Sequence, residues 1–255
     1  MDIKRASVLV TGGASGLGAA TVRAMCAAGA TAVIADVNRA VGEDLVRQLD
    51  GMAEFVQTDV TDEAAMRAAV NAAAAKSGGL RVLVNCAGVA IAEKVLGKEG
   101  PHPLDRFERV IRVNLIGTFN AMRLLAAEMQ TLEALQDGER GIIICTASVA
   151  GYEGQIGQAA YAASKGGVVA LVLPAAREFA QFGIRVNGVA PGIFSTPMLH
   201  ALPQDAQKSL AASVPFPKLL GQPPQYAALV RHMIENRYLN GEVVRLDGAL
   251  RMAPR

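Results

Sequence analysis

Along the chain, short runs of apolar and β-branched residues alternate with longer stretches in which apolar residues recur at helical spacing. The short runs lack the apolar–polar alternation of a half-exposed sheet, which is typical of strands that helices cover on both faces. Repeated units of strand, helix and parallel strand build a doubly wound sheet. We therefore predict an α/β fold with a seven-stranded parallel sheet, its strands at residues 7–10, 32–35, 54–57, 82–84, 142–145, 184–189 and 243–246.

The predicted helices lie between these strands and include one unusually long stretch. They span residues 17–28, 41–49, 104–132 and 161–182, and a further helix begins after Thr61 or Asp62, either of which suits the N-cap. No linker rich in proline, glycine or serine interrupts the series. We therefore expect one domain over residues 1–255, with helices on both faces of the sheet.

Composition and charge narrow the class of protein. Hydrophobic residues make up 51% of the 255 positions, and the formal net charge is +2 at pH 7. These values exclude a disordered chain and argue against nucleic acid or a membrane surface as the partner. The longest apolar run, residues 168–176, is about half the length needed to span a bilayer. Because the first strand begins so close to Met1, no room remains for a signal or transit peptide. We expect a cytoplasmic protein, with the mitochondrial matrix as the alternative.

The cysteines and histidines do not indicate a metal site. His102, His200 and His232 lack metal-ligand spacing, and no Cys-x-x-Cys pair occurs. We therefore predict free thiols and no bound metal.

A glycine-rich turn follows the first predicted strand and opens the first helix. It reads Thr11-Gly12-Gly13-Ala14-Ser15-Gly16-Leu17-Gly18. Glycine is needed where the backbone turns sharply and approaches a pyrophosphate, whose charge then lies at the N-terminus of a helix. The pattern predicts a dinucleotide site, although an ordinary strand-to-helix turn remains compatible with it.

Asp36 favours the dinucleotide interpretation. It ends the second strand, 18 residues beyond Gly18, where a carboxylate accepts hydrogen bonds from the ribose hydroxyls of an adenosine. The same carboxylate repels a 2′-phosphate, and no basic residue stands directly after it. The sequence therefore favours NAD over NADP, and the alternative role for Asp36 is a helix or turn cap.

Polar and glycine signals also follow four later strands. They are Asp59-Val60, Asn85-Cys86-Ala87-Gly88, Ser148 and Pro191-Gly192. In an open parallel sheet the ligand crevice lies beyond the carboxyl ends of the strands. We therefore expect these positions to border one site.

A second constellation carries the chemistry. Tyr161 and Lys165 lie four residues apart on one helix face, and Ser148 ends the neighbouring strand. A hydroxyl, a phenol and an ammonium beside a nicotinamide suggest hydride transfer at an alcohol or carbonyl carbon. The Lys165 ammonium and the positive nicotinamide ring would stabilise the phenolate of Tyr161, and Ser148 would bind the substrate oxygen. A lone Tyr-x-x-x-Lys pair would indicate only an exposed helix face.

With these motifs, the sequence resembles the short-chain dehydrogenase/reductase family over its whole length. The matching residues are Thr11-Gly12-x-x-x-Gly16-x-Gly18, Asp59, Asn85-x-Ala87-Gly88, Asn114, Ser148, Tyr161-x-x-x-Lys165, Asn187 and Pro191-Gly192. The resemblance implies a Rossmann arrangement, with Asn114, Ser148, Tyr161 and Lys165 as the catalytic residues.

The resemblance also implies individual roles. Tyr161 would be the catalytic base and Ser148 the ligand of the substrate oxygen. Lys165 would bind the nicotinamide ribose and lower the pKa of the tyrosine, while Asn114 would hold a water that links Lys165 to solvent. Cys86 departs from the family, which commonly has a second asparagine there, and we interpret it as structural.

The predicted ligand contacts form two sets. The cofactor-binding residues are Gly12, Ser15, Gly16, Leu17, Gly18, Asp36, Asp59, Val60, Asn85, Ala87, Gly88, Tyr161, Lys165, Pro191, Gly192, Phe194 and Thr196. The substrate-binding residues are Ser148, Gln155 and Tyr161, where Gln155 either reaches a thioester or makes an ordinary loop hydrogen bond. The long connection over about residues 193–217 is interpreted as a substrate lid.

Longer strings, such as the one from Asn240 to Met252, are similar to a branch of the family that oxidises 3-hydroxyacyl-CoA thioesters with NAD. That similarity implies a homotetramer acting in fatty acid and branched-chain amino acid degradation, with 2-methyl-3-hydroxyacyl-CoA among its substrates. Two alternatives remain open. One is a dehydrogenase of hydroxysteroids or other small hydrophobic secondary alcohols, and the other is a non-enzymatic NAD-binding scaffold subunit.

Overall fold

Seven parallel strands form one sheet in the order β3-β2-β1-β4-β7-β8-β9. The computed structural model describes residues 1–4, 6–98, 100–200 and 203–254. The strands are β1 Ser7–Thr11, β2 Thr31–Asp36, β3 Ala53–Gln57, β4 Leu80–Asn85, β7 Gly141–Thr146, β8 Ile184–Pro191 and β9 Val243–Leu246. The strand order reverses between β1 and β4, so the predicted doubly wound sheet is confirmed.

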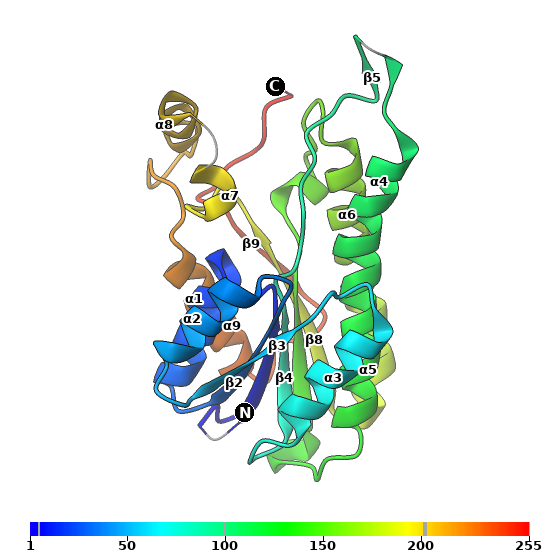
Figure 1. The fold of residues 1–255 in the computed structure, drawn as a ribbon, viewed down its shortest axis with the longest axis vertical. Helices are drawn as coiled ribbons and strands as arrows, with labels where there is room; N and C mark the ends of the chain where they lie inside the picture. Colours follow the sequence, from blue (N-terminus) through cyan, green and yellow to red (C-terminus); the bar gives the residue numbers. More distant parts are fainter. Residues whose placement is uncertain (5, 99, 201–202, 255) are drawn as a thin grey trace.

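Helices cover both faces of the sheet (Figure 1). On one face lie α1 Gly16–Ala27, α2 Arg39–Arg47 and α9 Pro223–Glu235; on the other lie α3 Glu63–Ala74, α4 Leu104–Ile111, α5 Gly117–Met129 and α6 Ala159–Phe179. Short helices α7 Pro197–His200 and α8 Gln204–Ala212 occupy the predicted lid, whose residues 201–202 lie outside the described residues. The described residues also form 3₁₀ segments at Gln136–Gly138, Val149–Gly151 and Ala180–Phe182.

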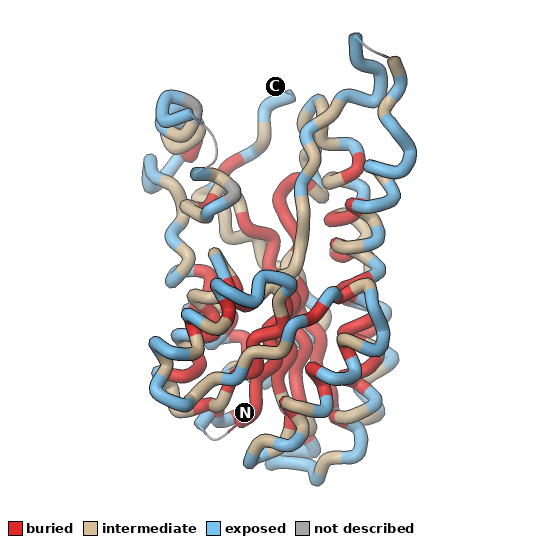
Figure 2. The backbone as a smooth tube through the Cα atoms, in the orientation of Figure 1, coloured by how far each residue is buried: buried red, intermediate tan, exposed pale blue. Residues whose placement is uncertain are grey.

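The core runs along both faces of the central strands, where buried backbone predominates (Figure 2). Val10 pairs with Ile34 of β2 on one side and with Val84 of β4 on the other, and all three side chains are fully buried. Because successive strand residues point to opposite faces, Leu9 enters the other core layer. This two-sided burial explains why the strand sequences are continuously apolar.

The predicted helix over residues 104–132 contains a π-helical turn. Helix α4 passes into a π-helix at Arg112–Ile116 and then into α5, and the Gly117 amide donates to the Arg112 carbonyl. A π-turn inserts one extra residue, so it shifts the helix face that meets the sheet and is frequent at functional sites. Asn114 lies within this turn and is fully buried.

Two helical stretches in the described part of the chain are long and apolar enough to cross a membrane by length and composition. They are Leu104–Met129 and Ala159–Phe182, with 56% and 39% of the apolar window buried. In this structure both pack on the same face of the sheet, as core helices do. Leu173 on helix α6 is nevertheless exposed.

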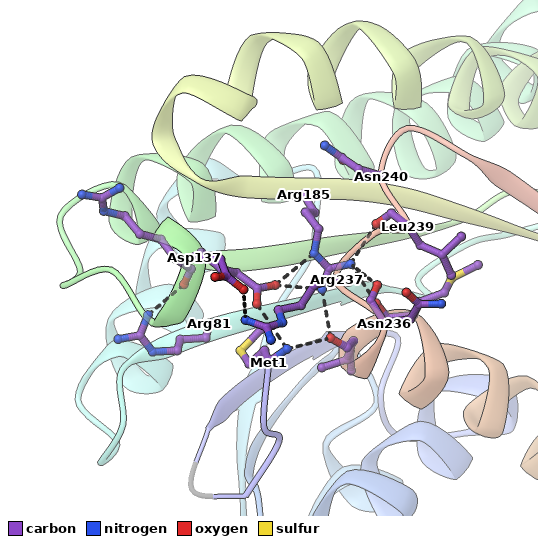
Figure 3. Close-up of polar contacts among 12 residues, drawn as sticks. Met1, Arg81, Asp137, Arg185, Asn236, Arg237, Leu239 and Asn240 are labelled. Atoms are coloured by element: carbon purple, nitrogen blue, oxygen red, sulfur yellow. Dashed lines mark hydrogen bonds and ion pairs between the residues drawn. The ribbon is translucent and has the colours of Figure 1, made fainter.

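A buried ion pair lies at the amino end of the sheet (Figure 3). Arg185 of β8 donates through Nε and Nη2 to Oε1 of Glu139, at 2.9 and 2.8 Å. The same guanidinium donates to the carbonyls of Met233 and Ile234 in the last turn of α9. The amino group of Met1 lies 3.2 Å from the other oxygen of Glu139. Arg185 therefore satisfies helix-end carbonyls and a carboxylate together.

Candidate active site

The glycine-rich turn is packed so tightly that side chains are excluded. Gly12 has a φ of +62°, and a Cβ there would lie 2.6 Å from the amide nitrogen of Ala87. A Cβ on Gly18 would lie 2.1 Å from the Gly12 carbonyl oxygen. Helix α1 has no acidic residue in its first turn, and its N-cap Ser15 makes no side-chain capping bond. The turn therefore leaves open backbone amides at a helix N-terminus, which suits the phosphates of a dinucleotide.

Asp36 faces this turn from the end of β2. Its Oδ2 accepts from the amide of Ala14 at 3.1 Å, and its Oδ1 accepts from the amide of Asn38 at 3.0 Å. The carboxylate is partly exposed and has no cationic partner among the described residues. Asp36 thus caps the turn, which is the alternative role considered for it, and its contact with a ribose stays a prediction.

The predicted contacts at β3 and β4 have different surroundings. Asp59 is exposed and accepts from the amide and hydroxyl of Thr61, both at 2.8 Å. Val60 is buried and packs against Gly117, where a Cβ would lie 2.5 Å from the valine. Asn85 is buried and accepts from Thr11 Oγ1 at 3.4 Å. These side chains position the strand ends, and their contact with a cofactor stays a prediction.

Ser148 and Tyr161 meet although the chain separates them by a loop. Ser148 follows β7 and accepts from the amide of Ala150 at 3.1 Å, while Tyr161 lies in the first turn of α6. Burial raises the pKa of the Tyr161 phenol, and a hydrogen bond with Ser148 opposes that shift. Any lowering by Lys165 and a positively charged nicotinamide must therefore overcome this burial.

Lys165 is buried and has no charged partner among the residues that the structure describes. Its Nζ donates to the Thr146 carbonyl at 2.7 Å and lies 5.8 Å from the centre of the Tyr161 ring. A Cβ on Gly88 would lie 3.6 Å from this Nζ. Burial lowers the pKa of Lys165 to about 8. The structure thus brings Gly88, Tyr161 and Lys165 to the same place, as the sequence predicted.

Asn114 reaches this group through other residues. Its Oδ1 accepts from the Val89 amide at 2.8 Å, and its Nδ2 donates to the Val89 carbonyl and to Ser164 Oγ at 2.9 and 3.0 Å. Ser164 in turn donates to the Tyr161 carbonyl at 2.7 Å. Asn114 therefore fixes the segment after β4 against α6, and its predicted relay of protons from Lys165 stays a prediction.

The sequence did not predict a polar group around Thr146, the residue whose carbonyl accepts from Lys165. Tyr226 of α9 is fully buried, and its hydroxyl lies 2.7 Å from Thr146 Oγ1 and 3.6 Å from Cys86 Sγ. Burial raises the pKa of the Cys86 thiol. These contacts agree with a structural role for Cys86. No local signal marked Tyr226, because it stands far along the chain in an ordinary amphipathic helix.

The start of the predicted lid lies beside the glycine turn. A Cβ on Gly16 would lie 3.6 Å from Cγ2 of Thr196, so Thr196 faces the turn directly. Phe194 is buried, and its ring covers Gly221, where a Cβ would lie 2.8 Å away. The ring of Phe194 therefore packs inside the protein. Gly192 lies against Asp247, and a Cβ on this glycine would lie 2.8 Å from Cβ of Asp247.

Gln155 makes a loop hydrogen bond. Its Nε2 donates to the Ala253 carbonyl at 2.9 Å, and its amide donates to Oε1 of Gln158 at 3.3 Å. This is the second of the two roles considered for it, and contact with a substrate stays a prediction. Among the described residues, no group of three or more His, Cys, Asp and Glu side chains is arranged to hold a metal.

The chain is similar to known dehydrogenases over nearly its full length. A short chain dehydrogenase family model matches residues 6–207. A Bos taurus protein named 3-hydroxyacyl-CoA dehydrogenase type-2 is 53% identical, over 99% of this chain and 98% of the relative. The Drosophila melanogaster protein of the same name is 50% identical, over 99% and 100%.

A solved structure extends this similarity to the fold. The crystal structure of 3-hydroxyacyl-CoA dehydrogenase type-2 from Mycobacterium avium superposes with a TM-score of 0.95 at 45% identity, covering 98% of this chain and 97% of that one. The glycine turn and the Ser148–Tyr161–Lys165 group lie within the part of the chain that the family model matches. The chain belongs to the short-chain dehydrogenase family of oxidoreductases.

Proposed function

We propose that this protein oxidises 3-hydroxyacyl-CoA to 3-ketoacyl-CoA with NAD, including short branched 2-methyl-3-hydroxyacyl-CoA. The observation that carries the proposal is the convergence of Ser148, Tyr161 and Lys165 beside Gly88, at the carboxyl end of the sheet. The names of the relatives that match over the full chain support the substrate class.

The cofactor site fits a nicotinamide dinucleotide. Gly12, Gly16 and Gly18 would admit its pyrophosphate at the N-terminus of α1, and Asp36 would accept from the adenosine ribose. A 2′-phosphate there would face the Asp36 carboxylate without a basic partner, which favours NAD over NADP. A bound nicotinamide supplies the hydride acceptor.

The residues of this chain would handle the alcohol and its proton. Tyr161 Oη takes the proton of the substrate hydroxyl as hydride leaves the carbon that bears this hydroxyl. That carbon becomes the carbonyl carbon of a ketone. Ser148 Oγ hydrogen-bonds the substrate oxygen and stabilises the charge that develops on it. Lys165, held on the Thr146 carbonyl, brings a positive charge near the phenol and favours its ionised form.

A homotetramer is the proposed assembly. Ile116 and Phe119 near the start of α5 and Leu173 on α6 are exposed although apolar, and the two helices are neighbours on one face. Pairing these faces across a two-fold axis would cover the apolar surface that one chain leaves open. Native mass spectrometry tests this assembly, and a monomer at micromolar concentration would exclude it.

One substrate panel tests the activity. The purified protein is incubated with NAD or NADP and with 3-hydroxybutyryl-CoA, 2-methyl-3-hydroxybutyryl-CoA, a hydroxysteroid or a cyclic secondary alcohol, and absorbance of the reduced cofactor is followed. We expect the highest kcat/KM for an acyl-CoA with NAD. Turnover of the steroid or the free alcohol alone would favour the secondary-alcohol dehydrogenase, and turnover of neither would support the scaffold.

A further inference from the structure

The chain after β9 crosses the loop that joins Ser148 to Tyr161. This C-terminal segment (residues 247–254) runs beyond the strand ends toward the top of the molecule (Figure 1). The amide of Ile156 donates to the Pro254 carbonyl at 3.0 Å, and Gln155 Nε2 donates to the Ala253 carbonyl at 2.9 Å. The loop itself has only one short 3₁₀ turn, so much of its position depends on contacts from elsewhere.

Glu153 is the main attachment point in that loop. Its two carboxylate oxygens accept from Nη1 and Nη2 of Arg245, at 2.8 and 3.2 Å. The amide of Met252 donates to the same carboxylate at 2.9 Å, and Arg251 lies 3.3 Å away. A carboxylate with a bidentate arginine and a backbone donor has a strongly restricted geometry.

Arg245 is itself fixed by both segments. Its Nε donates to Asp247 at 2.7 Å, its Nη2 donates to the Leu250 carbonyl at 2.8 Å, and its guanidinium lies 5.4 Å from the centre of the Tyr152 ring. The side chain thus joins the end of β9, the C-terminal segment and the loop in one unit.

The C-terminal segment also contacts the two other walls of the candidate site. Asp247 fills the space beside Gly192, at the turn that follows β8. Farther on, the Gly248 carbonyl accepts from the Phe216 amide at 3.3 Å, at the end of the predicted lid. A Cβ on Gly248 would lie 2.6 Å from Val214, so the contact is close.

We propose that the C-terminal segment, held by Glu153, is a positioning element of the substrate site. It fixes the loop between Ser148 and Tyr161 and the end of the lid at once, and it sets the orientation of Gln155. This role rests on the proposed function, because the substrate whose binding the segment would assist is 3-hydroxyacyl-CoA. Glu153 acts through the loop and does not touch the reacting atoms.

Glu153→Gln tests the proposal. The amide loses the charge that holds Arg245, so the loop should move more freely while the cofactor turn stays intact. We expect KM for 3-hydroxybutyryl-CoA to rise about five- to tenfold, with kcat and the Kd of NADH within about twofold of wild type. Exchange of the Ile156 amide with deuterium should accelerate. The matched control is Glu235→Gln, which weakens the exposed pair with Arg231 and should change none of these values.

Met252→Pro is the second variant. It removes the amide that donates to Glu153 but leaves the ion pair with Arg245, so it loosens the partly exposed end of the segment and leaves the buried Leu250 in place. We expect the same direction of change in KM and in Ile156 exchange, at about half the size on a logarithmic scale.

The outcomes separate the two proposals. An unchanged KM in both variants, or a loss of NADH affinity and thermal stability in step with KM, would overturn the positioning role. Absence of acyl-CoA turnover in the wild type would overturn the proposed function. If the inactive wild type still exchanges the Ile156 amide slowly, and either variant accelerates this exchange, the segment fixes the loop for another substrate class. That result also overturns the proposal as stated.

Discussion

At the amino end of the sheet, the buried Arg185 is paired with Glu139 and donates to several backbone carbonyls. At the carboxyl end, the buried Lys165 has one carbonyl and the face of an aromatic ring as its partners, and no ion pair within the described residues. Asp36, at the same end, accepts from two backbone amides and has no ion pair within the described residues. The two ends of one sheet thus surround their charges differently.

We interpret the paired charge as structural and the unpaired charges as available to a ligand. Burying a charge without a counterion costs free energy. Such a charge is therefore expected at a functional site, where a ligand can interact with it. The guanidinium of Arg185 has no N–H group left for a ligand, whereas Lys165 and Asp36 can still form hydrogen bonds with one. Substitution of Arg185 at the amino end should therefore lower stability, whereas substitutions at the carboxyl end should change activity, cofactor binding or the pH dependence of stability.

The largest effect is expected at the carboxyl end, from Tyr161→Phe. The variant keeps the ring and removes the group that takes the substrate proton, so kcat/KM should fall about a thousandfold or more. That loss corresponds to about 4 kcal/mol in the barrier. Melting temperature should stay near the wild-type value, and the control Tyr238→Phe, at a fully exposed position, should change neither quantity. Activity within tenfold of wild type would assign the base elsewhere.

Arg185→Met tests the amino end and should act on stability. The variant leaves the Glu139 carboxylate buried and deprives the last turn of α9 of its donors, so the free energy of unfolding should fall by about 3–5 kcal/mol. Urea unfolding measures it, with KM for substrate and cofactor unchanged in the folded fraction. The control Arg231→Met removes an exposed pair and should cost about 0.5 kcal/mol or less. A loss below about 1 kcal/mol would end the distinction between the two ends.

Lys165→Met measures the unpaired charge directly. Because the folded pKa of about 8 lies below the unfolded value, the unfolded chain binds more protons between these values, and wild-type stability rises with pH there. The methionine variant lacks this rise. Between pH 7 and pH 9.5 the wild type should gain about 2 kcal/mol relative to the variant. Urea unfolding of both proteins at the two pH values measures the difference, and parallel pH profiles would show that Lys165 keeps its ordinary pKa.

The smallest of these effects is expected from Asp36→Asn. Loss of the negative charge should weaken NADH binding about tenfold, because the ribose loses its charged acceptor. It should also narrow the preference for NADH over NADPH, because the repulsion of a 2′-phosphate disappears. Fluorescence titration gives both Kd values. Asp44→Asn, on the exposed side of α2, is the control. An unchanged ratio of the two Kd values would leave Asp36 as a turn cap only.

Much of the fold could be predicted because its signals are local. The continuous apolar runs marked the strands of the main sheet, and Asp62 is the N-cap of α3, accepting from the Ala64 amide at 2.8 Å. The π-turn at Asn114 was not predicted, because the whole stretch over residues 104–132 was interpreted as one continuous helix. The hairpin of β5 Leu96–Gly97 and β6 Gly100–Pro101 was not predicted, because strands of two residues are too short to show an apolar–polar pattern.

The candidate site likewise has features that local sequence predicts and others that only the fold brings together. Tyr161 and Lys165 share a helix face by spacing alone, and the glycine turn is recognisable from its pattern. The contacts of Tyr226 with Thr146 and of Glu153 with Arg245 join segments far apart in the chain, and no local spacing indicates them. Gln155 showed the limit most clearly, since only the fold decides whether a polar loop residue meets a ligand or a backbone carbonyl.

The sequence by itself determined the layers of the fold, the turn that admits a dinucleotide and the helix face that carries the phenol and the ammonium. Each of these depends on periodicity, glycine conformation or a spacing of four residues, which are properties of neighbouring positions. Only the tertiary structure decided which charges are paired. Whether Arg185 is saturated and Lys165 is not depends on burial and on partners from distant strands and helices, and these exist only when the chain is folded.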